Sequence, residues 1–328
     1  MHRRRSILGV AAASILPPAR LALAQGAAAF PDRPVRLVVA FPPGGPTDVV
    51  ARVLAERMAR DLGQPVVVEN RGGANGNIAA EAVAKAPPDG HTVLYNTSSI
   101  AISRALYLTL PYDVLRDLRP VALTAASPLA LVVHPSLPPR DPQGFIDWAK
   151  ANSGRVSYSS GGVGNISHLL SFLVLRHIGA QATHVPYRGT AAALTDAAAG
   201  NVQFTSDTVV TALPVIQEGR VRAIAVSSAA RTPLLPDVPS MAESGMMPPG
   251  FEVGAWQGVL APARTPPDAV SRLNAAVRAA LADPEVRARL AAQGAQPTGG
   301  SPEDYARYLR EEVERWGRVV AESGATAE

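Results

Sequence analysis

The sequence predicts an α/β protein built from two doubly wound lobes. Short apolar runs of strand length alternate with amphipathic stretches of helix length, a pattern typical of parallel sheets covered by helices. This alternation occurs twice along the chain. In addition, 328 residues, of which 47% are hydrophobic, are more than a single hydrophobic core usually accommodates.

The first series of elements has the order βαβαβ. Its expected strands are Val35–Ala40, Val66–Glu69 and His91–Tyr95. The first helix carries apolar side chains on one face and ends at Gly63, and the second helix spans Ile78–Lys85. This order predicts a parallel sheet that is covered on both faces.

The second series starts after Pro128. Its expected strands are Leu129–Val133, Val156–Ser159, Thr183–Val185 and Val202–Thr205, and its expected helices are Gly144–Ala151, Ile166–Ile178 and Ala191–Ala198. After it come a strand at Val221–Val226, the short apolar run Gly258–Leu260, and amphipathic helices at Ala269–Leu281 and Pro302–Val320. The two closing helices need a sheet to pack on, and we expect it to be the first one.

We therefore expect lobe 1 to be discontinuous, with residues 25–127 and 223–328, and lobe 2 to span residues 128–222. Two chain crossings, near Thr124–Ser127 and Ala223–Ser227, would form a hinge between the lobes. A small ligand would bind in the cleft between the lobes.

The first 24 residues have the organisation of a cleavable signal peptide. The arginines Arg3–Arg5 precede the short apolar stretch Ile7–Leu16, and the small residues Ala22-Leu23-Ala24 offer a cleavage site. The apolar stretch is too short to span a bilayer. We expect a periplasmic protein exported by the Sec route, with twin-arginine export as the alternative because of the Arg4-Arg5 pair.

Composition excludes several classes of function. Four arginines lie in the signal segment, and without them the formal net charge falls from +4 to zero, so no basic footprint for nucleic acid remains. The chain has no cysteine, which excludes disulfides, thiol catalysis and cysteine metal sites. No His, Asp and Glu residues have the spacing of a metal site, and we expect neither a metal nor a cofactor.

The stretch FPPGGPTD, Phe41–Asp48, lies between the first strand and the first helix. Ligands of open parallel sheets bind beyond the carboxyl ends of the strands, and the free N–H groups of a first helical turn favour an anion there. Gly44 and Gly45 would let a ligand approach the backbone closely. The alternatives are a plain structural turn, and a helix dipole already occupied by the carboxylate of Asp48.

A second glycine-rich loop, Ser159–Asn165, again lies between a strand and a helix. No Lys-Ser/Thr pair follows its glycines, so it is not a Walker phosphate loop. Two such loops on opposing lobes could bind one anionic ligand from both sides when the lobes close. A flexible loop without a ligand is the alternative.

Several motifs, taken together and in this order, resemble those of the Bug-type extracytoplasmic solute receptors of tripartite tricarboxylate transporters. The motifs are FPPGG, VVVENRGGANGNIA, LPYD, SYSSGGVGN followed by SHL, HVPYRG, VRAIAVSS and RTPLLPDVPSMAESG. The resemblance covers essentially the whole mature chain. Two departures stand out: Asn165 replaces the usual serine, and Ser171-Phe172-Leu173 replaces a stretch that usually carries an acidic residue.

The resemblance implies the type II periplasmic binding protein fold, also called the Venus flytrap, with a hinge and an interlobe cleft. It further implies a monomeric receptor, without enzymatic activity, that binds a small organic carboxylate and delivers it to the membrane permease subunits of a tripartite transporter. The ligand-binding residues that we expect are Phe41, Pro43, Gly44, Gly45, Thr47, Asp48, Ser98, Ser159, Ser160, Gly161, Gly164, Asn165, His168 and Asp207.

Two other functions stay open at this point. One is a periplasmic hydrolase with Ser159 or Ser160 as nucleophile and His168 as base, although the sequence offers no set of nucleophile, base and orienting residue. The other is a sensor component that presents its ligand to a signalling partner. The role of Asp207 also has two interpretations, because its carboxylate could pair with a ligand ammonium group or cap the following helix.

Overall fold

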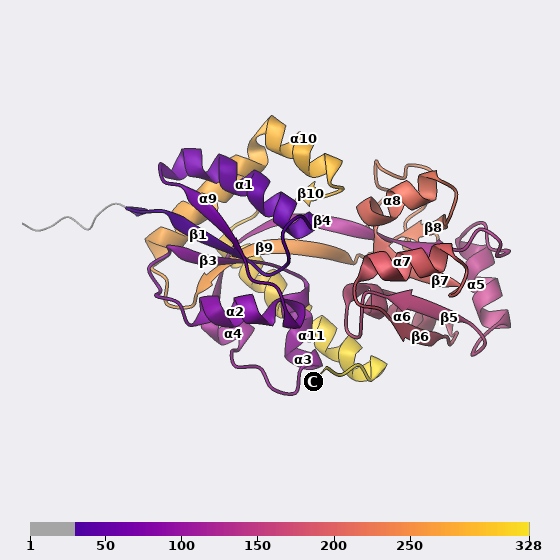
Figure 1. Ribbon diagram of the computed structural model, residues 1–328. Coiled ribbons are helices and arrows are strands. Elements are labelled where there is room, and N and C mark those ends of the chain that lie inside the picture. The colour runs from indigo at the N-terminus through magenta and orange to yellow at the C-terminus, as the bar shows by residue number, and fades with distance from the viewer. Residues whose placement is uncertain (1–29, 328) are drawn as a thin grey trace, which may run out of the picture.

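The computed structural model describes residues 30–327 and shows two α/β lobes joined by a long shared strand (Figure 1). The expected signal peptide, residues 1–24, lies outside the described residues. Within residues 30–327, every helix is too short or too polar to cross a membrane.

The sheet of the first lobe has the strand order β2-β1-β3-β9-β4. Strands β1 (Val35–Val39), β2 (Val66–Asn70) and β3 (Thr92–Thr97) are parallel, as predicted. Strand β9 (Gly254–Pro262) lies antiparallel to β3, and the short β10 (Gln296–Pro297) pairs with β4. The predicted parallel order of these three strands is therefore confirmed, but the sheet as a whole is mixed, because β9 returns from the second half of the chain into its middle.

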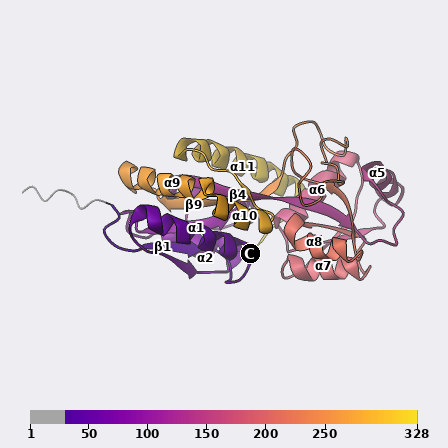
Figure 2. The same ribbon diagram turned by 90° about the horizontal axis from the view of Figure 1, so that it is seen from above.

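Strand β4 (Leu118–Val133) belongs to both lobes (Figures 1 and 2). Its first part, up to Pro128, pairs with β9, and its last part, Leu129–Val133, pairs with strands of the second lobe. Within this one continuous strand, the chain therefore passes from the first sheet to the second.

The sheet of the second lobe has the order β6-β5-β7-β4, and β8 pairs with the other edge of β4. Strands β5 (Ser157–Ser160), β6 (Thr183–Pro186) and β7 (Phe204–Thr208) are parallel, whereas β4 is antiparallel to β7 and to β8 (Arg222–Val226). The helices of this lobe are α5 (Pro142–Ala151), α6 (Ile166–Ile178), α7 (Thr190–Ala198) and α8 (Val209–Gln217).

Because β8 pairs with β4 in the second sheet, we propose that lobe 2 runs from residue 129 to residue 253 rather than ending at 222. The loop after β8 folds back on the same strand, since the Met241 N–H donates to the Val226 carbonyl at 2.8 Å. The chain then passes Val253, whose N–H donates to the Ser227 carbonyl at 2.9 Å, and enters β9. This assignment places the second crossing at Val253–Gly254.

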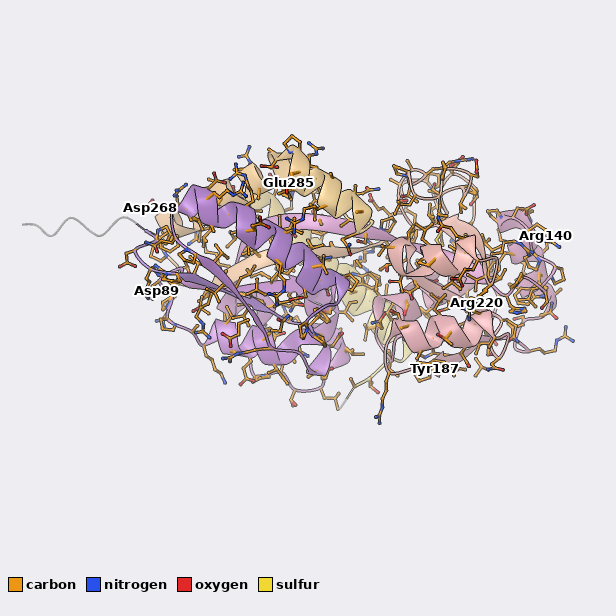
Figure 3. The ribbon with its side chains drawn as sticks, turned by 45° about the horizontal axis from the view of Figure 1, so that its top comes forward. Asp89, Arg140, Tyr187, Arg220, Asp268 and Glu285 are labelled. Atoms are coloured by element: carbon orange, nitrogen blue, oxygen red, sulfur yellow. The ribbon has the colours of Figure 1, made fainter. Side chains whose placement is uncertain are left out.

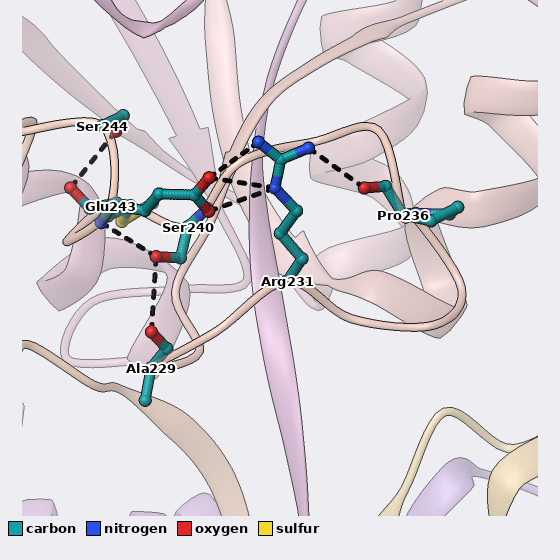
Figure 4. Close-up of polar contacts among 7 residues, drawn as sticks. Ala229, Arg231, Pro236, Ser240, Glu243 and Ser244 are labelled. Carbon is teal, nitrogen blue, oxygen red and sulfur yellow. Dashed lines mark hydrogen bonds and ion pairs between the residues drawn. The ribbon is translucent and has the colours of Figure 1, made fainter.

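The motif RTPLLPDVPSMAESG forms this loop (Figure 4). Arg231 forms a forked ion pair with Glu243, with a shortest distance of 2.7 Å from guanidinium nitrogen to carboxylate oxygen. The Ser240 hydroxyl accepts from the Glu243 N–H at 3.0 Å, and Arg231 also donates to the Pro236 carbonyl. These contacts give the motif a structural role, because they hold the loop in its observed conformation.

Helices cover both faces of the first sheet. Helices α1 (Pro46–Leu62), α9 (Pro267–Ala282) and α10 (Pro284–Ala292) pack on one face, and α2 (Asn77–Ala84), α3 (Ser99–Leu106) and α11 (Pro302–Ser323) pack on the other. The one-turn helix α4 (Val114–Asp117) precedes β4, and η1 (Ala74–Gly76) precedes α2. Along β1, Leu37 and Val39 face the first set of helices and Val38 faces the second, which explains its unbroken apolar run.

Charged residues lie at the surface of both lobes (Figure 3). Asp268 and Glu285 are exposed on lobe 1, and Arg140 and Arg220 are exposed on lobe 2. Among residues 30–327, an ion pair joins the lobes where Arg176 of α6 contacts Glu322 near the end of α11. Helix α11 therefore extends from its own lobe to the other one (Figure 1).

Candidate functional site

A cavity of about 180 Å³ lies where the two lobes face each other. Lobe 1 contributes the loop after β1, the junction of β3 with α3, and the start of β9. Lobe 2 contributes the loop before α6 and the junctions that precede α7 and α8. The lining residues are Phe41, Pro46, Thr47, Asn75, Thr97, Ser98, Ser99, Ile102, Ser127, Leu129, Gly164, Asn165, Ile166, Ser167, Thr190, Asp207, Thr208, Val210, Thr211, Ala255 and Gln257.

The lining is rich in hydroxyl and amide groups and poor in charge. Nine of these residues are serine or threonine, and two are asparagine with one further glutamine. Asp207 is the sole ionisable side chain among them. A ligand in this cavity would be held by hydrogen bonds and packing, and not by an ion pair with a cationic side chain.

The loop between β1 and α1 presents the start of a helix to the cavity. Gly45 is the N-cap and Pro46 occupies the first helical position. The first intrahelical hydrogen bond joins the Val49 N–H to the Gly45 carbonyl at 3.0 Å, so the N–H groups of Thr47 and Asp48 precede the helical hydrogen-bond pattern. Gly44 has φ +81°, a conformation that glycine adopts without strain.

Asp48 holds this loop in place from behind. Its side chain is 3% exposed and accepts hydrogen bonds from Gly44 N–H (2.9 Å), Arg52 Nε (2.9 Å) and Asn70 Nδ2 (2.8 Å). Burial alone would raise the pKa of the Asp48 carboxyl, but these donors outweigh it and hold the pKa below its ordinary value. Asn70 also donates to the Phe41 carbonyl at 3.0 Å, which ties the loop to the end of β2.

The second glycine-rich loop uses most of its N–H groups internally. Gly161 donates to Ser167 Oγ at 3.0 Å, Gly162 to Ser160 Oγ at 3.2 Å, and Gly164 to His168 Nδ1 at 3.1 Å. Asn165 is the N-cap of α6, because its Oδ1 accepts from the Ser167 N–H at 3.0 Å. The loop is thus rigidly held, but it offers fewer free N–H groups than the sequence alone suggests.

Gly164 also marks a close approach of the two lobes. It has φ +69°, and a Cβ atom built on it would lie 2.4 Å from the side chain of Leu106, at the end of α3 in lobe 1. Any other residue at this position would have a strained φ and would require the Leu106 side chain to move.

Asp207 lies at the end of β7, and its side chain is buried in the cavity wall with 2% exposure. Its Oδ1 accepts from the Thr208 N–H at 2.7 Å, whereas its Oδ2 has no hydrogen-bond partner within the described residues. Burial raises the pKa of this carboxyl to about 7, against the opposing effects of the Thr208 N–H and the nearby Thr190 hydroxyl.

The serines proposed as nucleophiles do not meet His168. Ser159 Oγ donates to the Ala193 carbonyl at 2.9 Å, and Ser160 Oγ lies 2.6 Å from Nε2 of a different histidine, His184. Both serines are fully buried. The hydrolase arrangement with His168 as base is therefore wrong.

His168 and His184 instead form a stacked pair beneath the loop, with ring centroids 3.7 Å apart. Burial lowers the pKa of His168 to about 4, with a further contribution from His184, and burial alone lowers that of His184 to about 4. In their neutral form, the two rings hold the loop through hydrogen bonds to Ser160 and Gly164.

The structure brings some of the predicted residues together at the cavity and places others behind it. The predicted residues that line the cavity are Phe41, Thr47, Ser98, Gly164, Asn165 and Asp207. Those that lie outside the lining are Pro43, Gly44, Gly45, Asp48, Ser159, Ser160, Gly161 and His168.

Sequence reasoning missed most of the hydroxyl groups. The missed polar lining residues are Asn75, Thr97, Ser99, Ser127, Ser167, Thr190, Thr208, Thr211 and Gln257. Several of them directly follow a strand or begin a helix, and this position at the sheet edge is the signal that could have found them. Within residues 30–327, no cluster of side chains could hold a metal ion.

Comparisons with known proteins agree with this architecture. A sequence model described as "Tripartite tricarboxylate transporter family receptor" matches residues 50–325. Protein BugT of Bordetella pertussis is 38% identical over 99% of this chain and 98% of its own length.

Three solved structures have the same fold. The periplasmic binding protein BugD is 36% identical, with a TM-score of 0.76 over 91% of this chain and all of its own. A Rhodopseudomonas palustris protein solved with adipate is 38% identical, with a TM-score of 0.79 over 90% of this chain and 99% of its own. MatC of the same organism, solved with bound malate, is 39% identical, with a TM-score of 0.75 over 89% of this chain and all of its own.

The matching family model describes a transporter receptor, BugD is a periplasmic binding protein, and the two lobes described above have the Venus flytrap architecture. The chain belongs to the receptor family of the tripartite tricarboxylate transporters and is a Bug-type member of it.

Proposed function

We propose that this receptor binds a small organic carboxylate in the interlobe cavity and delivers it to the membrane permease subunits of a tripartite transporter. The observation that carries the proposal is the cavity itself, which lies between the lobes and is lined by hydroxyl and amide groups and the first turn of α1. The similarity of this chain to proteins solved with adipate and with malate supports this ligand class.

The proposed binding chemistry relies on neutral donors. Hydrogen bonds to a charged group each contribute about 1.5–3 kcal/mol, so a few hydroxyl and N–H donors can hold a carboxylate without a cationic partner. The N–H groups and the dipole at the start of α1 add to this attraction. We assign the ligand contacts to Phe41, Thr47, Ser98, Gly164, Asn165 and Asp207, together with the further lining residues.

The residues behind the cavity are proposed to act by preorganisation. Asp48 and Asn70 fix the first loop, and the internal hydrogen bonds of Ser159–Asn165 fix the second. A loop that is already ordered has less conformational entropy to lose when the ligand binds.

The proposal extends to location and partners. We propose a periplasmic monomer exported through a signal peptide at residues 1–24, in agreement with the periplasmic location stated for BugD. We also propose that it is not an enzyme, since its buried serines pair with a backbone carbonyl and with His184 instead of facing the cavity.

Calorimetric titration of the mature protein with dicarboxylates, amino acids and aromatic acids tests this proposal. We expect at least one acid to bind with one-to-one stoichiometry, and its neutral diamide or amide to bind far more weakly. Thr47→Val removes a cavity hydroxyl without changing the side-chain volume much, and we expect it to weaken binding by about 1.5–3 kcal/mol.

Thr109→Val is the matched control, because Thr109 is exposed and lies outside the cavity lining. The proposal fails if no acid in the panel binds, or if both valine variants change the affinity equally.

A further inference from the structure

The wall of the cavity contains a buried carboxyl group, Asp207, of which only one oxygen accepts a hydrogen bond. Asp207 Oδ1 accepts from the Thr208 N–H, but Oδ2 has no partner among residues 30–327. A buried oxygen without a hydrogen bond carries a free-energy cost, so it is usually explained by an absent ligand or water or by a bound proton. Because Asp207 lines the cavity, a group of a ligand bound there could supply the partner that Oδ2 lacks.

The residues that line the cavity place no positive charge beside this carboxyl. The elements around it contribute neutral side chains: Thr190 from α7, Thr208 and Thr211 from the start of α8, and Ser167 from α6. In the strand next to it, Ala130 of β4 is its register partner.

The other titratable groups near the cavity have partners elsewhere. His168 and His184 pair with each other and with the glycine-rich loop. Across the cavity, Asp48 is paired with Arg52 behind the first loop. None of these charges contributes to the pKa of Asp207, which burial raises to about 7.

Two kinds of ligand group could satisfy Oδ2: an ammonium that pairs with the ionised carboxylate, or a carboxylate that accepts a hydrogen bond from the protonated form. The surroundings favour the second, because the wall lacks the charged and water-exposed groups that would keep a carboxylate ionised. The hydroxyl groups around it also supply donors for a ligand anion.

We propose that Asp207 captures an anionic acid group in its protonated form, donating a hydrogen bond from Oδ2 to a ligand carboxylate, so that one proton enters the cavity with the ligand. The proposal rests on the proposed carboxylate-binding function and deepens it: the ligand is an acid without an ammonium group at this position. The proton comes from solvent, and the two carboxyl groups share it in the complex, since two ionised carboxylates cannot lie side by side without a counter-charge.

Calorimetry with malate and with adipate, from about pH 5.5 to pH 8.5 and in two buffers of different ionisation enthalpy, measures the protons taken up per ligand. We expect proton uptake to rise from near zero at the acidic end to about one at the alkaline end. The affinity should fall by about tenfold per pH unit above the pKa of Asp207.

Asp207→Asn places an amide donor where the protonated acid stands. We expect this variant to bind with an affinity that does not vary with pH and without proton uptake. Asp268→Asn, at an exposed site on α9, is the control and should keep the wild-type profile.

Binding of malate or adipate by the wild type without proton uptake at any pH would overturn the proposal. So would tight binding of aspartate or glutamate that Asp207→Asn abolishes, since that result indicates ammonium pairing.

A second measurement needs no ligand and separates this proposal from the proposed function. A carboxyl whose pKa is raised in the folded state destabilises that state as pH rises between its unfolded value and about 7. The melting temperature of Asp207→Asn should therefore increase relative to wild type as pH rises from 4 to 7. Identical pH dependence in the two proteins would overturn the proposal, even if an acid binds. Failure of every acid to bind, with the pH difference present, would instead overturn the proposed function.

Discussion

The stacked histidines His168 and His184 hold the glycine-rich loop Ser159–Asn165 through hydrogen bonds. The His168 ring accepts a hydrogen bond from the Gly164 N–H at Nδ1, so this nitrogen carries no proton. The His184 ring pairs with the Ser160 hydroxyl through Nε2. Protonation of both would place two like charges 3.7 Å apart, measured between ring centroids, on one buried and one half-buried ring. We therefore expect the stability of the loop to depend on pH through these two rings.

The folded state binds protons at these rings less readily than the unfolded state does. The stabilising contribution of the pair is present above pH 6.5 and is lost as the pH falls from 6.5 through about 4. We expect the melting temperature of the wild type to fall more steeply over this interval than that of His184→Gln, whose amide can still pair with Ser160. His177→Gln, at an exposed position, serves as control. Parallel pH profiles for all three proteins would contradict this role.

At the scale of elements, the N-cap residues of the helices fix the positions of the loops that line the cavity. Asn165 begins α6 and lines the cavity at the same time. We expect Asn165→Ala to lower the free energy of unfolding by about 1 kcal/mol, because the Ser167 N–H loses its acceptor, and Asn165→Ser to retain most of it. Urea denaturation measures both. Equal losses in the two variants would show that the cap does not stabilise the helix.

The sequence was sufficient to predict the strands that alternate with helices, because their apolar runs and glycine ends are local signals. It could not place β9 in the middle of the first sheet, since only the run Gly258–Leu260 is recognisably apolar and its partners are far away in the chain. The same limit applies to the site. Phe41, Thr47 and Asp207 were predicted from their positions after strands, whereas the role of Asp48 depends on Asn70, which lies 22 residues further along.

At the scale of the whole molecule, the contact between Leu106 and Gly164 limits how the lobes approach. A methyl group at residue 164 would collide with Leu106, so Gly164→Ala should favour a more open arrangement. We expect affinity for the acid ligand to fall at least about tenfold, equivalent to about 1.4 kcal/mol, and small-angle scattering to give a larger radius of gyration at ligand saturation.

Gly219→Ala is the matched control. Gly219 has φ +71°, close to that of Gly164, but a Cβ atom there would have no neighbour within 4 Å. The control carries a similar backbone cost without the collision between lobes. If both variants bind and close alike, the interlobe contact does not govern closure.

A crystal structure of the mature protein with the tightest-binding acid of the calorimetric panel tests the central claim most directly. We expect the acid between the lobes, with a carboxylate oxygen within hydrogen-bond distance of the first turn of α1 near Thr47 and of lobe 2 groups that include Asp207. An acid bound on the surface of one lobe, or in the cavity without contacts to both lobes, would contradict the account.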